Sequence, residues 1–393
     1  MSSNAEHWDS ITVEQLRAIR GRKWSHYPDA LGAFIAETDF GTAPAVTEAL
    51  RQVVDTSYYG YLTPDLTQRL REATASWLAD RYGWQVDPLS VRRLPDVLSG
   101  LEVTLEYFTK RTDSAIILPT PAYMPFLSVP KPAWRRETIT VPLAEDGGRW
   151  SLDLDAIDRA FAAGGEVLVL SNPHNPTGRV YTRDELVALS EVVERHGGRV
   201  FSDEIHAPLV YQPNRHVPYA TVNETAASHT ITATSASKAW NLAGLKSAQL
   251  ILSNEADARH WRKIGYWPED GASTIGVIAN TAAYEHGRQW LDDEVTYLDR
   301  NRRLLTDLLT RHLPQARFYE PEGTYLAWID LRAYDLPTPL FDFFLHEAGV
   351  AITDGRATGR EGAGFIRVNF ATPTPILRQI VAQLGNAVSR HLA

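Results

Sequence analysis

The sequence predicts an α/β protein in which a large domain with a mostly parallel central sheet is followed by a smaller α+β domain. Two observations predict this. Residues 166–202 contain a strand, a turn, a helix and a second strand at the lengths of a βαβ unit, which places the two strands parallel. From about residue 284 the pattern changes to a long, charged, leucine-rich helix and then to mixed strands and helices.

The composition is that of an ordinary globular chain, and it narrows the possible functions. The 393 residues are enough for two or three domains. A net charge of −9 argues against a general nucleic-acid or anionic-membrane surface. The lack of cysteine excludes disulfides, thiolate metal sites and cysteine nucleophiles, and we expect no metal. The polar N-terminus predicts neither a signal peptide nor a membrane anchor, so we expect a cytoplasmic protein.

The first half of the chain contains a clear helix and a buried strand. Residues 64–82 carry apolar side chains at helical spacing, with Pro64 at the start and Gly83 at the end. Residues 114–118 form an apolar run that prolines at 119 and 121 terminate, which predicts a strand.

The βαβ unit follows. Residues 166–171 predict a strand, and the proline-rich residues 172–178 predict a turn. A capping box at residues 182–185 begins a helix to about residue 196, and residues 199–202 form the next strand.

The remaining elements suggest where the chain divides. We predict strands at 229–234, 247–252, 325–330 and 364–370, and helices at 284–313, 340–348 and 376–391. Residues 46–283 then form the large domain and residues 284–393 the small one, joined by the helix at 284–313. An N-terminal segment, residues 1–45, packs with the small domain.

Three polar segments follow predicted strands: residues 172–178, residues 203–206 and residues 235–238. In parallel α/β sheets, ligands bind at the carboxyl ends of the strands. We therefore expect these segments to open onto one crevice.

Lys238 is the most informative residue of the crevice. Ser235 precedes it by three residues, a turn containing Gly244 follows it, and a second cation, Lys246, lies eight residues on. These features suit pyridoxal phosphate (PLP), because the lysine would form a Schiff base with the aldehyde while hydroxyl and cation hold the phosphate.

Asp203 and Asn175 each have a functional and a purely structural interpretation. A buried carboxylate at 203 would keep the PLP ring nitrogen protonated, or Asp203 caps a turn. Asn175 would donate to the ring oxygen, or it is a turn residue between two prolines.

Three further features extend the candidate site. Arg367, in an otherwise apolar strand, would grip a substrate carboxylate or form an internal salt bridge. Tyr123 would stack on a planar ring, or it packs within its loop. Ser99, Gly100 and Leu101 begin a helix whose free N–H groups suit phosphate, although Ser-Gly is common at helix starts.

Together these motifs resemble the fold-type I PLP enzymes of the class I/II aminotransferase superfamily. More narrowly, they resemble the cystathionine β-lyase or cysteine-S-conjugate β-lyase branch, the MalY/PatB type. The resemblance extends from about residue 22 to the C-terminus and is strongest at residues 172–178, 202–208, 237–246, 321–328 and 367–373.

The resemblance implies a role for each site residue and a homodimer with shared active sites. Lys238 carries the Schiff base, Asp203 pairs with the ring nitrogen, Asn175 and His206 lie at the ring oxygen, and Tyr123 stacks. Arg367 binds the substrate α-carboxylate. The phosphate is held by Ser99, Gly100, Ser235, Lys246 and Tyr61 of the neighbouring subunit.

Two positions depart from the pattern of the family. Thr38 stands where relatives usually carry methionine, and Thr358 stands where an aromatic residue is expected. Both stretches lie near the substrate side chain in the family, so the exchanges hint at a substrate other than plain cystathionine.

The resemblance predicts α,β-elimination that releases thiol, pyruvate and ammonia from a cysteine S-conjugate or a cystathionine-like amino acid. Transamination uses the same residues, and decarboxylation-linked deamination is a further alternative. A regulatory binding role is the third interpretation, but the short polar N-terminus leaves no room for a DNA-binding domain.

Overall fold

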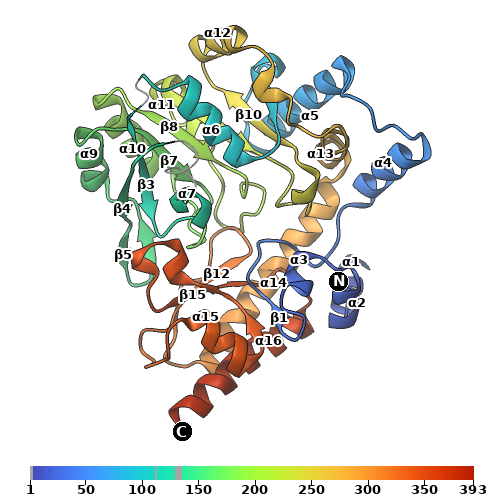
Figure 1. Cartoon of the computed structure of the whole chain (residues 1–393), viewed down its shortest axis with the longest axis vertical. Coiled ribbons are helices and arrows are strands. Elements are labelled where there is room, and N and C mark those ends of the chain that lie inside the picture. The colour runs from blue at the N-terminus through green and yellow to red at the C-terminus, as the bar shows by residue number, and fades with distance from the viewer. Residues whose placement is uncertain (1–2, 111–112, 129–134) are drawn as a thin grey trace.

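The computed structural model of the chain describes residues 3–110, 113–128 and 135–393. A large sheet flanked by helices lies above a smaller unit built from the C-terminal part of the chain (Figure 1). The N-terminal helices α1, α2 and α3 lie beside this smaller unit (Figure 1). They comprise Ser3–Asp9, Val13–Ala18 and Arg22–Ser25.

The central sheet has seven strands in the order β2-β10-β9-β8-β7-β3-β4. The five strands from β9 to β4 are parallel, whereas β10 pairs antiparallel with both β9 and β2. The bounds are β2 Val91–Leu94, β3 Ala115–Thr120, β4 Thr138–Pro142, β7 Gly165–Ser171, β8 Arg199–Asp203, β9 Thr230–Thr234 and β10 Ala248–Leu252. The predicted mostly parallel sheet is confirmed.

Helices cover both faces of this sheet, which is why its strands are apolar on both sides. In β3, Ile116 and Leu118 belong to one core and Ile117 to the other, as expected for alternating side chains. The first core contains side chains of α6 (Val97–Tyr107) and α12 (Glu255–Ile264). The second contains side chains of α9 (Leu154–Ala162), α10 (Arg183–Arg195) and α11 (Glu224–His229).

The smaller unit contains a four-stranded antiparallel sheet in the order β11-β12-β15-β14. The N-terminal segment joins it, because β1 pairs in parallel with β13. The bounds are β1 Leu31–Gly32, β11 Arg317–Phe318, β12 Leu326–Asp330, β13 Val350–Ala351, β14 Thr353–Asp354, β15 Phe365–Asn369 and α16 Thr374–Leu392.

The helix predicted at residues 284–313 is wrong at its start. Two helices occupy this region, α13 (Thr274–His286) and α14 (Arg288–His312), and Gly287 separates them. The indole N–H of Trp240 donates to the Gly287 carbonyl at 3.1 Å, and a Cβ at 287 would lie 2.4 Å from that indole nitrogen. Close approach of a distant tryptophan therefore requires glycine here.

The other predicted strands and helices differ from the structure by at most two residues at either end, with one exception in kind. Residues 340–348 form a short helix, α15 (Leu340–Phe343), that continues as a π-helical turn, η5 (Phe344–Ala348). The helix α5 spans Pro64–Tyr82 as predicted, with Gly83 in the left-handed conformation at its end. In the described ranges, no helix combines the length and apolar character needed to cross a bilayer.

Glu294 lies on α14, the helix that extends from the large unit into the small one (Figure 1). Its side chain is fully buried, and neither carboxyl oxygen has a hydrogen-bond partner within the described part of the chain. Burial raises the pKa of Glu294 well above 4.5, and the nearby Thr38 hydroxyl offsets this only in part. Above pH 4.5, Glu294 therefore keeps its proton to a greater extent than a solvent-exposed glutamate does.

We expect Glu294→Gln to remove the loss of folding stability that Glu294 causes as the pH rises. Because the folded state holds this proton to a higher pH than the unfolded state, stability falls as pH rises above 4.5. The variant should therefore gain melting temperature relative to wild type at about pH 8, and this gain should shrink at about pH 5. Calorimetry of both proteins across pH measures the difference in melting temperature. Glu48→Gln, at an exposed position, is the control. A difference in melting temperature that does not change with pH would contradict the raised pKa of Glu294.

Candidate active site

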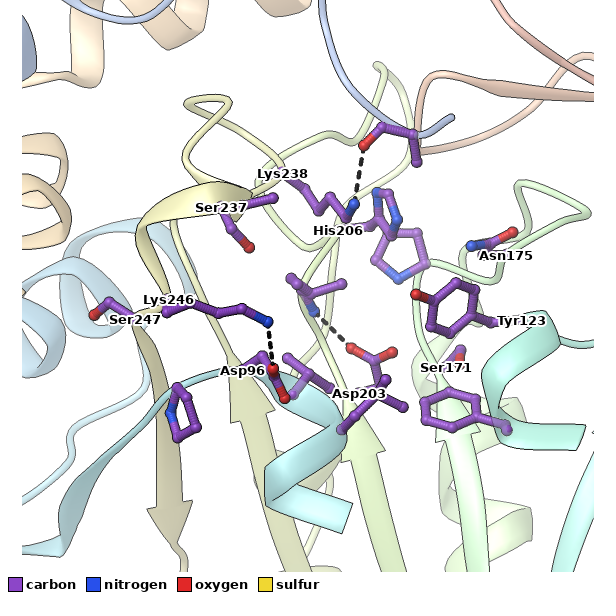
Figure 2. Close-up of a pocket in the computed structure, with 18 residues that line it drawn as sticks. Asp96, Tyr123, Ser171, Asn175, Asp203, His206, Ser237, Lys238, Lys246 and Ser247 are labelled. Carbon is purple, nitrogen blue, oxygen red and sulfur yellow. Dashed lines mark hydrogen bonds and ion pairs between the residues drawn. The ribbon is translucent and has the colours of Figure 1, made fainter. Parts of the chain in front are cut away.

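The carboxyl ends of three adjacent parallel strands form the candidate site. Strands β7, β8 and β9 end at Ser171, Asp203 and Thr234, and each is followed by one of the predicted polar segments. One cavity is lined by residues from all three: Ser171, Pro173, Asn175, Asp203, Ile205, His206, Ser237 and Lys238. Figure 2 shows Lys238, His206, Asn175, Tyr123 and Asp203 around this cavity.

Lys238 is half-buried in the turn after β9, and its ammonium donates to the Ala36 carbonyl at 2.9 Å (Figure 2). Burial lowers the pKa of Lys238 to about 8, with Glu37 opposing this shift and Arg367 adding to it. A sizeable fraction of the amine is therefore neutral near physiological pH. It is available as a nucleophile or a base.

Asp203 ends β8 and is the buried acid of the cavity. Its Oδ1 accepts from the Ile205 amide at 3.1 Å, which is the one hydrogen bond recorded for this carboxyl within the described residues. Burial raises the pKa of Asp203 to about 7, despite that bond and the nearby Lys238. A cation bound against the carboxylate would reverse this shift.

Arg367 and Asn175 are brought together from opposite parts of the chain. One Arg367 amino group donates to Asn175 Oδ1 at 3.0 Å, and the other donates to the Phe34 carbonyl at 2.8 Å. Arg367 is 2% exposed, its Nε has no partner, and no acid pairs with it in the described parts of the chain. Arg367 therefore does not form the internal salt bridge that the sequence left open as an alternative.

Tyr123 and His206 complete the wall of the cavity. Burial raises the pKa of Tyr123, and Asp203 adds to this while Arg367 opposes it, which places the phenol between these two charges. Burial lowers the pKa of His206 to about 3, so its imidazole is neutral. Its Nδ1 is buried without a protein partner, and its ring lies 5.8 Å from that of Tyr325.

Most of the residues expected to hold phosphate use their polar groups within the protein. Ser235 donates its hydroxyl to the Ser247 carbonyl at 2.6 Å and shapes the turn, whereas Ser237 lines the cavity. Helix α6 begins at Val97, two residues before Ser99. The amides of Ser99 and Gly100 bond to Asp96, and Leu101 is fully buried, so the free first-turn amides are those of Val97 and Leu98.

Asp96 is the cavity residue that the sequence reasoning missed. It caps α6 and accepts from Lys246 at 2.9 Å (Figure 2). Its signal in the sequence is the Asp-x-x-Ser spacing of an N-cap before an apolar run. That pattern marks a helix start, but it does not show that the cap faces a cavity.

Three further predicted residues lie outside the cavity in a single chain. The Thr358 hydroxyl donates to the Gly355 carbonyl at 2.6 Å. The Thr38 backbone is held by the Asn241 amide, and its hydroxyl lies near Glu294 instead of the cavity. Tyr61 is 97% exposed. A role for these residues in substrate or phosphate binding stays a prediction.

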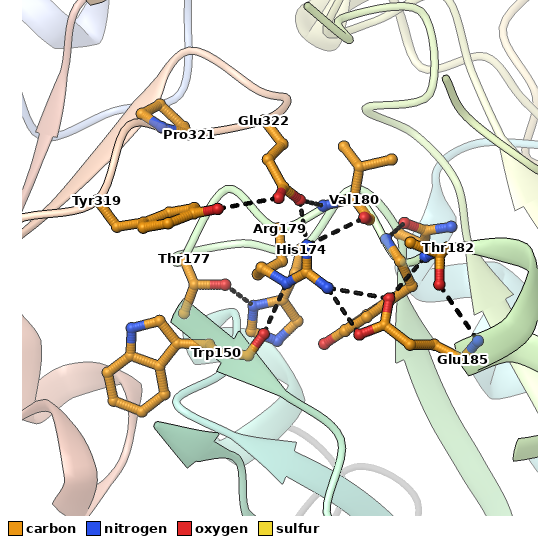
Figure 3. Close-up of polar contacts among 12 residues, drawn as sticks. Trp150, His174, Thr177, Arg179, Val180, Thr182, Glu185, Tyr319, Pro321 and Glu322 are labelled. Carbon is orange, nitrogen blue, oxygen red and sulfur yellow. Dashed lines mark hydrogen bonds and ion pairs between the residues drawn. The ribbon is translucent and has the colours of Figure 1, made fainter. Parts of the chain in front are cut away.

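A buried arginine holds the turn that carries Asn175 (Figure 3). Arg179 is 1% exposed and pairs with Glu185 at 2.7 Å and with Glu322. Glu322 also accepts from the Val180 amide at 2.8 Å, and its own amide donates to the Gly178 carbonyl. These contacts join the turn of the large unit to residues 321–323 of the small unit.

Comparison with known proteins identifies the family. Residues 33–384 match the family described as aminotransferase class I and II. The chain is 37% identical to the cystathionine beta-lyase of Corynebacterium glutamicum, covering 96% of this chain and 99% of that protein. It is 33% identical to cystathionine beta-lyase PatB of Bacillus subtilis (strain 168), covering 91% of this chain and 93% of that protein.

A solved structure from Corynebacterium diphtheriae, provisionally described as a PLP-dependent beta-cystathionase, superposes with a TM-score of 0.91. The sequence identity is 40%, and the match covers 96% of this chain and 98% of that one. The chain therefore belongs to the class I and II aminotransferase family. The fold and family predicted from the sequence are confirmed, as is the narrower resemblance to cystathionine β-lyases and PatB.

We expect Arg179→Met to destabilise the protein strongly. The substitution leaves the buried Glu322 carboxylate without its cation, and breaking a buried pair costs about 3–5 kcal/mol. Arg195→Gln is the matched control, because its pair with Asp158 is exposed and should contribute less than about 1 kcal/mol. Chemical unfolding measures both losses. Equal losses for the two variants would refute the role of Arg179 as the buried clamp.

Proposed function

We propose that the protein is a PLP-dependent carbon–sulfur β-lyase that cleaves cystathionine or a related cysteine S-conjugate. The observation that carries the proposal is the nearly full-length similarity to cystathionine β-lyases. One cavity lined by Lys238, Asp203 and Asn175, with Tyr123, His206 and Lys246, supports it. The reaction consumes the amino acid and one water and yields a thiol, pyruvate and ammonium.

The residues present fit PLP. Asp203 is a buried carboxylate that forms no ion pair among the described residues, and a protonated ring nitrogen is the partner that would lower its raised pKa. Lys238 offers a partly neutral amine to an aldehyde. Tyr123 borders the same space, and Asn175 and neutral His206 lie where a ring oxygen would be held. The phosphate would lie at Ser237, Lys246 and the first amides of α6.

When bound, PLP supplies an electron-accepting ring that stabilises the negative charge developing at the substrate Cα. Lys238 acts as the general base that removes the Cα proton, because its lowered pKa leaves more of the amine neutral than in an exposed lysine. Asp203 keeps its negative charge against the ring nitrogen, and Tyr123 and His206 restrict water. A thiolate then leaves from Cβ.

Arg367 binds the α-carboxylate of the substrate in this proposal. Its guanidinium is buried without an acid partner, so a carboxylate would satisfy both its charge and its unpartnered Nε. Its bond to Asn175, the residue assigned to the ring oxygen in this proposal, supports a substrate carboxylate close to the cofactor. A small amino acid is thus the class of substrate that the site fits.

The protein also acts as a homodimer in this proposal. Tyr59, Tyr61, Tyr266 and Trp267 form an exposed aromatic patch, with Tyr61 close to Tyr266 and the rings of Tyr266 and Trp267 stacked at 5.5 Å. Exposed patches of this kind commonly mark protein interfaces. A second copy covering this patch would bring Tyr61 towards the phosphate end of its cavity.

We expect a panel of cysteine S-conjugates to give pyruvate and free thiol in equal amounts. Pyruvate is measured by coupled reduction and thiol by a colorimetric reagent. Lys238→Ala, which lacks the base and the amine that bonds the cofactor, should lose turnover by about 10³-fold or more and fail to develop the visible absorbance of bound PLP. A thioether keto acid with pyridoxamine phosphate would instead identify a transaminase.

We expect the purified protein to have twice the mass of one chain by light scattering. Trp267→Arg should shift this equilibrium towards monomer, because it places a charge in the aromatic patch. Leu392→Arg, an equally drastic change at an exposed residue near the C-terminus, should leave the mass unchanged. An active wild-type monomer would contradict the shared site.

A further inference from the structure

The end of the cavity away from Asn175 and Tyr123 contains an ion pair (Figure 2). Lys246 Nζ lies 2.9 Å from Asp96 Oδ2, and the two side chains are 57% and 37% exposed. Both residues line the cavity, together with Val97, Leu98 and Ser237. A carboxylate therefore stands at the end where the phosphate of the cofactor would bind.

The backbone fixes both members of this pair. Asp96 is the N-cap of α6, and its Oδ1 accepts from both the amide and the hydroxyl of Ser99 at 2.9 Å. Lys246 has a left-handed backbone, with φ at 55°. The carboxylate cannot turn away from the cavity without leaving the Ser99 amide unpaired, which costs helix stability.

The two side-chain charges at this end cancel, which leaves only the partial positive charge of a helix N-terminus. Lys246 contributes one positive charge, Asp96 cancels it, and the N-terminus of α6 adds about half a positive charge. The other charged residues that line the cavity, Lys238 and Asp203, also oppose each other in sign. A phosphate dianion would therefore enter a cavity with little net positive charge and beside a carboxylate.

We propose that Asp96 weakens cofactor binding by competing with the phosphate of PLP for Lys246 and for the amides that begin α6. The inference rests on the proposed function, because it assumes that PLP binds here. Asp96 then sets how tightly the enzyme holds its cofactor, and cofactor occupancy follows the free PLP concentration.

Asp96→Asn tests the proposal because asparagine is an equally good N-cap and removes only the charge. We expect about tenfold tighter PLP binding, which is about 1.4 kcal/mol, measured by titrating the apoprotein and following the absorbance of bound PLP. Binding to the variant should weaken as salt rises, since its site has a net positive charge, whereas wild type should respond less. Inorganic phosphate should also compete better in the variant.

Asp153→Asn is the matched control. Asp153 caps α9 by accepting from the Ala156 amide, so it has the same capping chemistry but does not line the cavity. This variant should bind PLP like wild type. The background of Lys246→Gln gives a second test, because Asp96 is unpaired there and its removal should improve affinity by a larger factor than in wild type.

Each outcome has a distinct meaning. Unchanged affinity in Asp96→Asn would show that Asp96 only caps the helix, and weaker affinity would show that it orients Lys246 for the phosphate; either result overturns the inference. A wild-type protein that takes up no PLP under any condition would instead refute the proposed function.

Discussion

Burial of charged groups without matching partners is the constraint on which the rest of the structure depends. Lys238 and Asp203 line one cavity, and Arg367 donates to Asn175 in its wall. Burial shifts the pKa of each of these three groups towards the neutral form. Such burial is unfavourable unless other groups hydrogen-bond to the charge. The backbone carbonyls of Ala36 and Phe34 do so for Lys238 and Arg367. Asp203 depends on one amide and is left for a ligand.

Hydrogen bonds between the smaller unit and the N-terminal segment hold this part of the backbone in place. Asn369 donates to the carbonyls of Ile35 and Glu37, and the Tyr325 hydroxyl donates to Ala36. Arg179 clamps the Asn175 turn to residues 321–323 from the other side. Lys238 and Asp203 thus form no direct ion pair among the described residues, whereas Asp96 and Lys246 at the other end of the cavity pair directly.

Much of the fold was predictable because its signals are local. The capping box at Thr182 begins α10, and Gly83 ends α5, since each effect involves residues a few positions apart. The βαβ pattern predicts parallel strands, and parallel strands bring Asn175, Asp203 and Lys238 to one edge. The break at Gly287 was not predictable, because it depends on Trp240, which is distant in the sequence.

The sequence by itself determined the fold class and the family, because these follow from short motifs and from the order of strands and helices. The tertiary structure decided which polar side chains face the cavity. Ser237 lines it and Ser235 does not, because the Ser247 carbonyl takes the Ser235 hydroxyl. Asp96 lines the cavity beside Lys246 and Thr38 lies near Glu294, because residues far along the chain come close in space only in the folded protein.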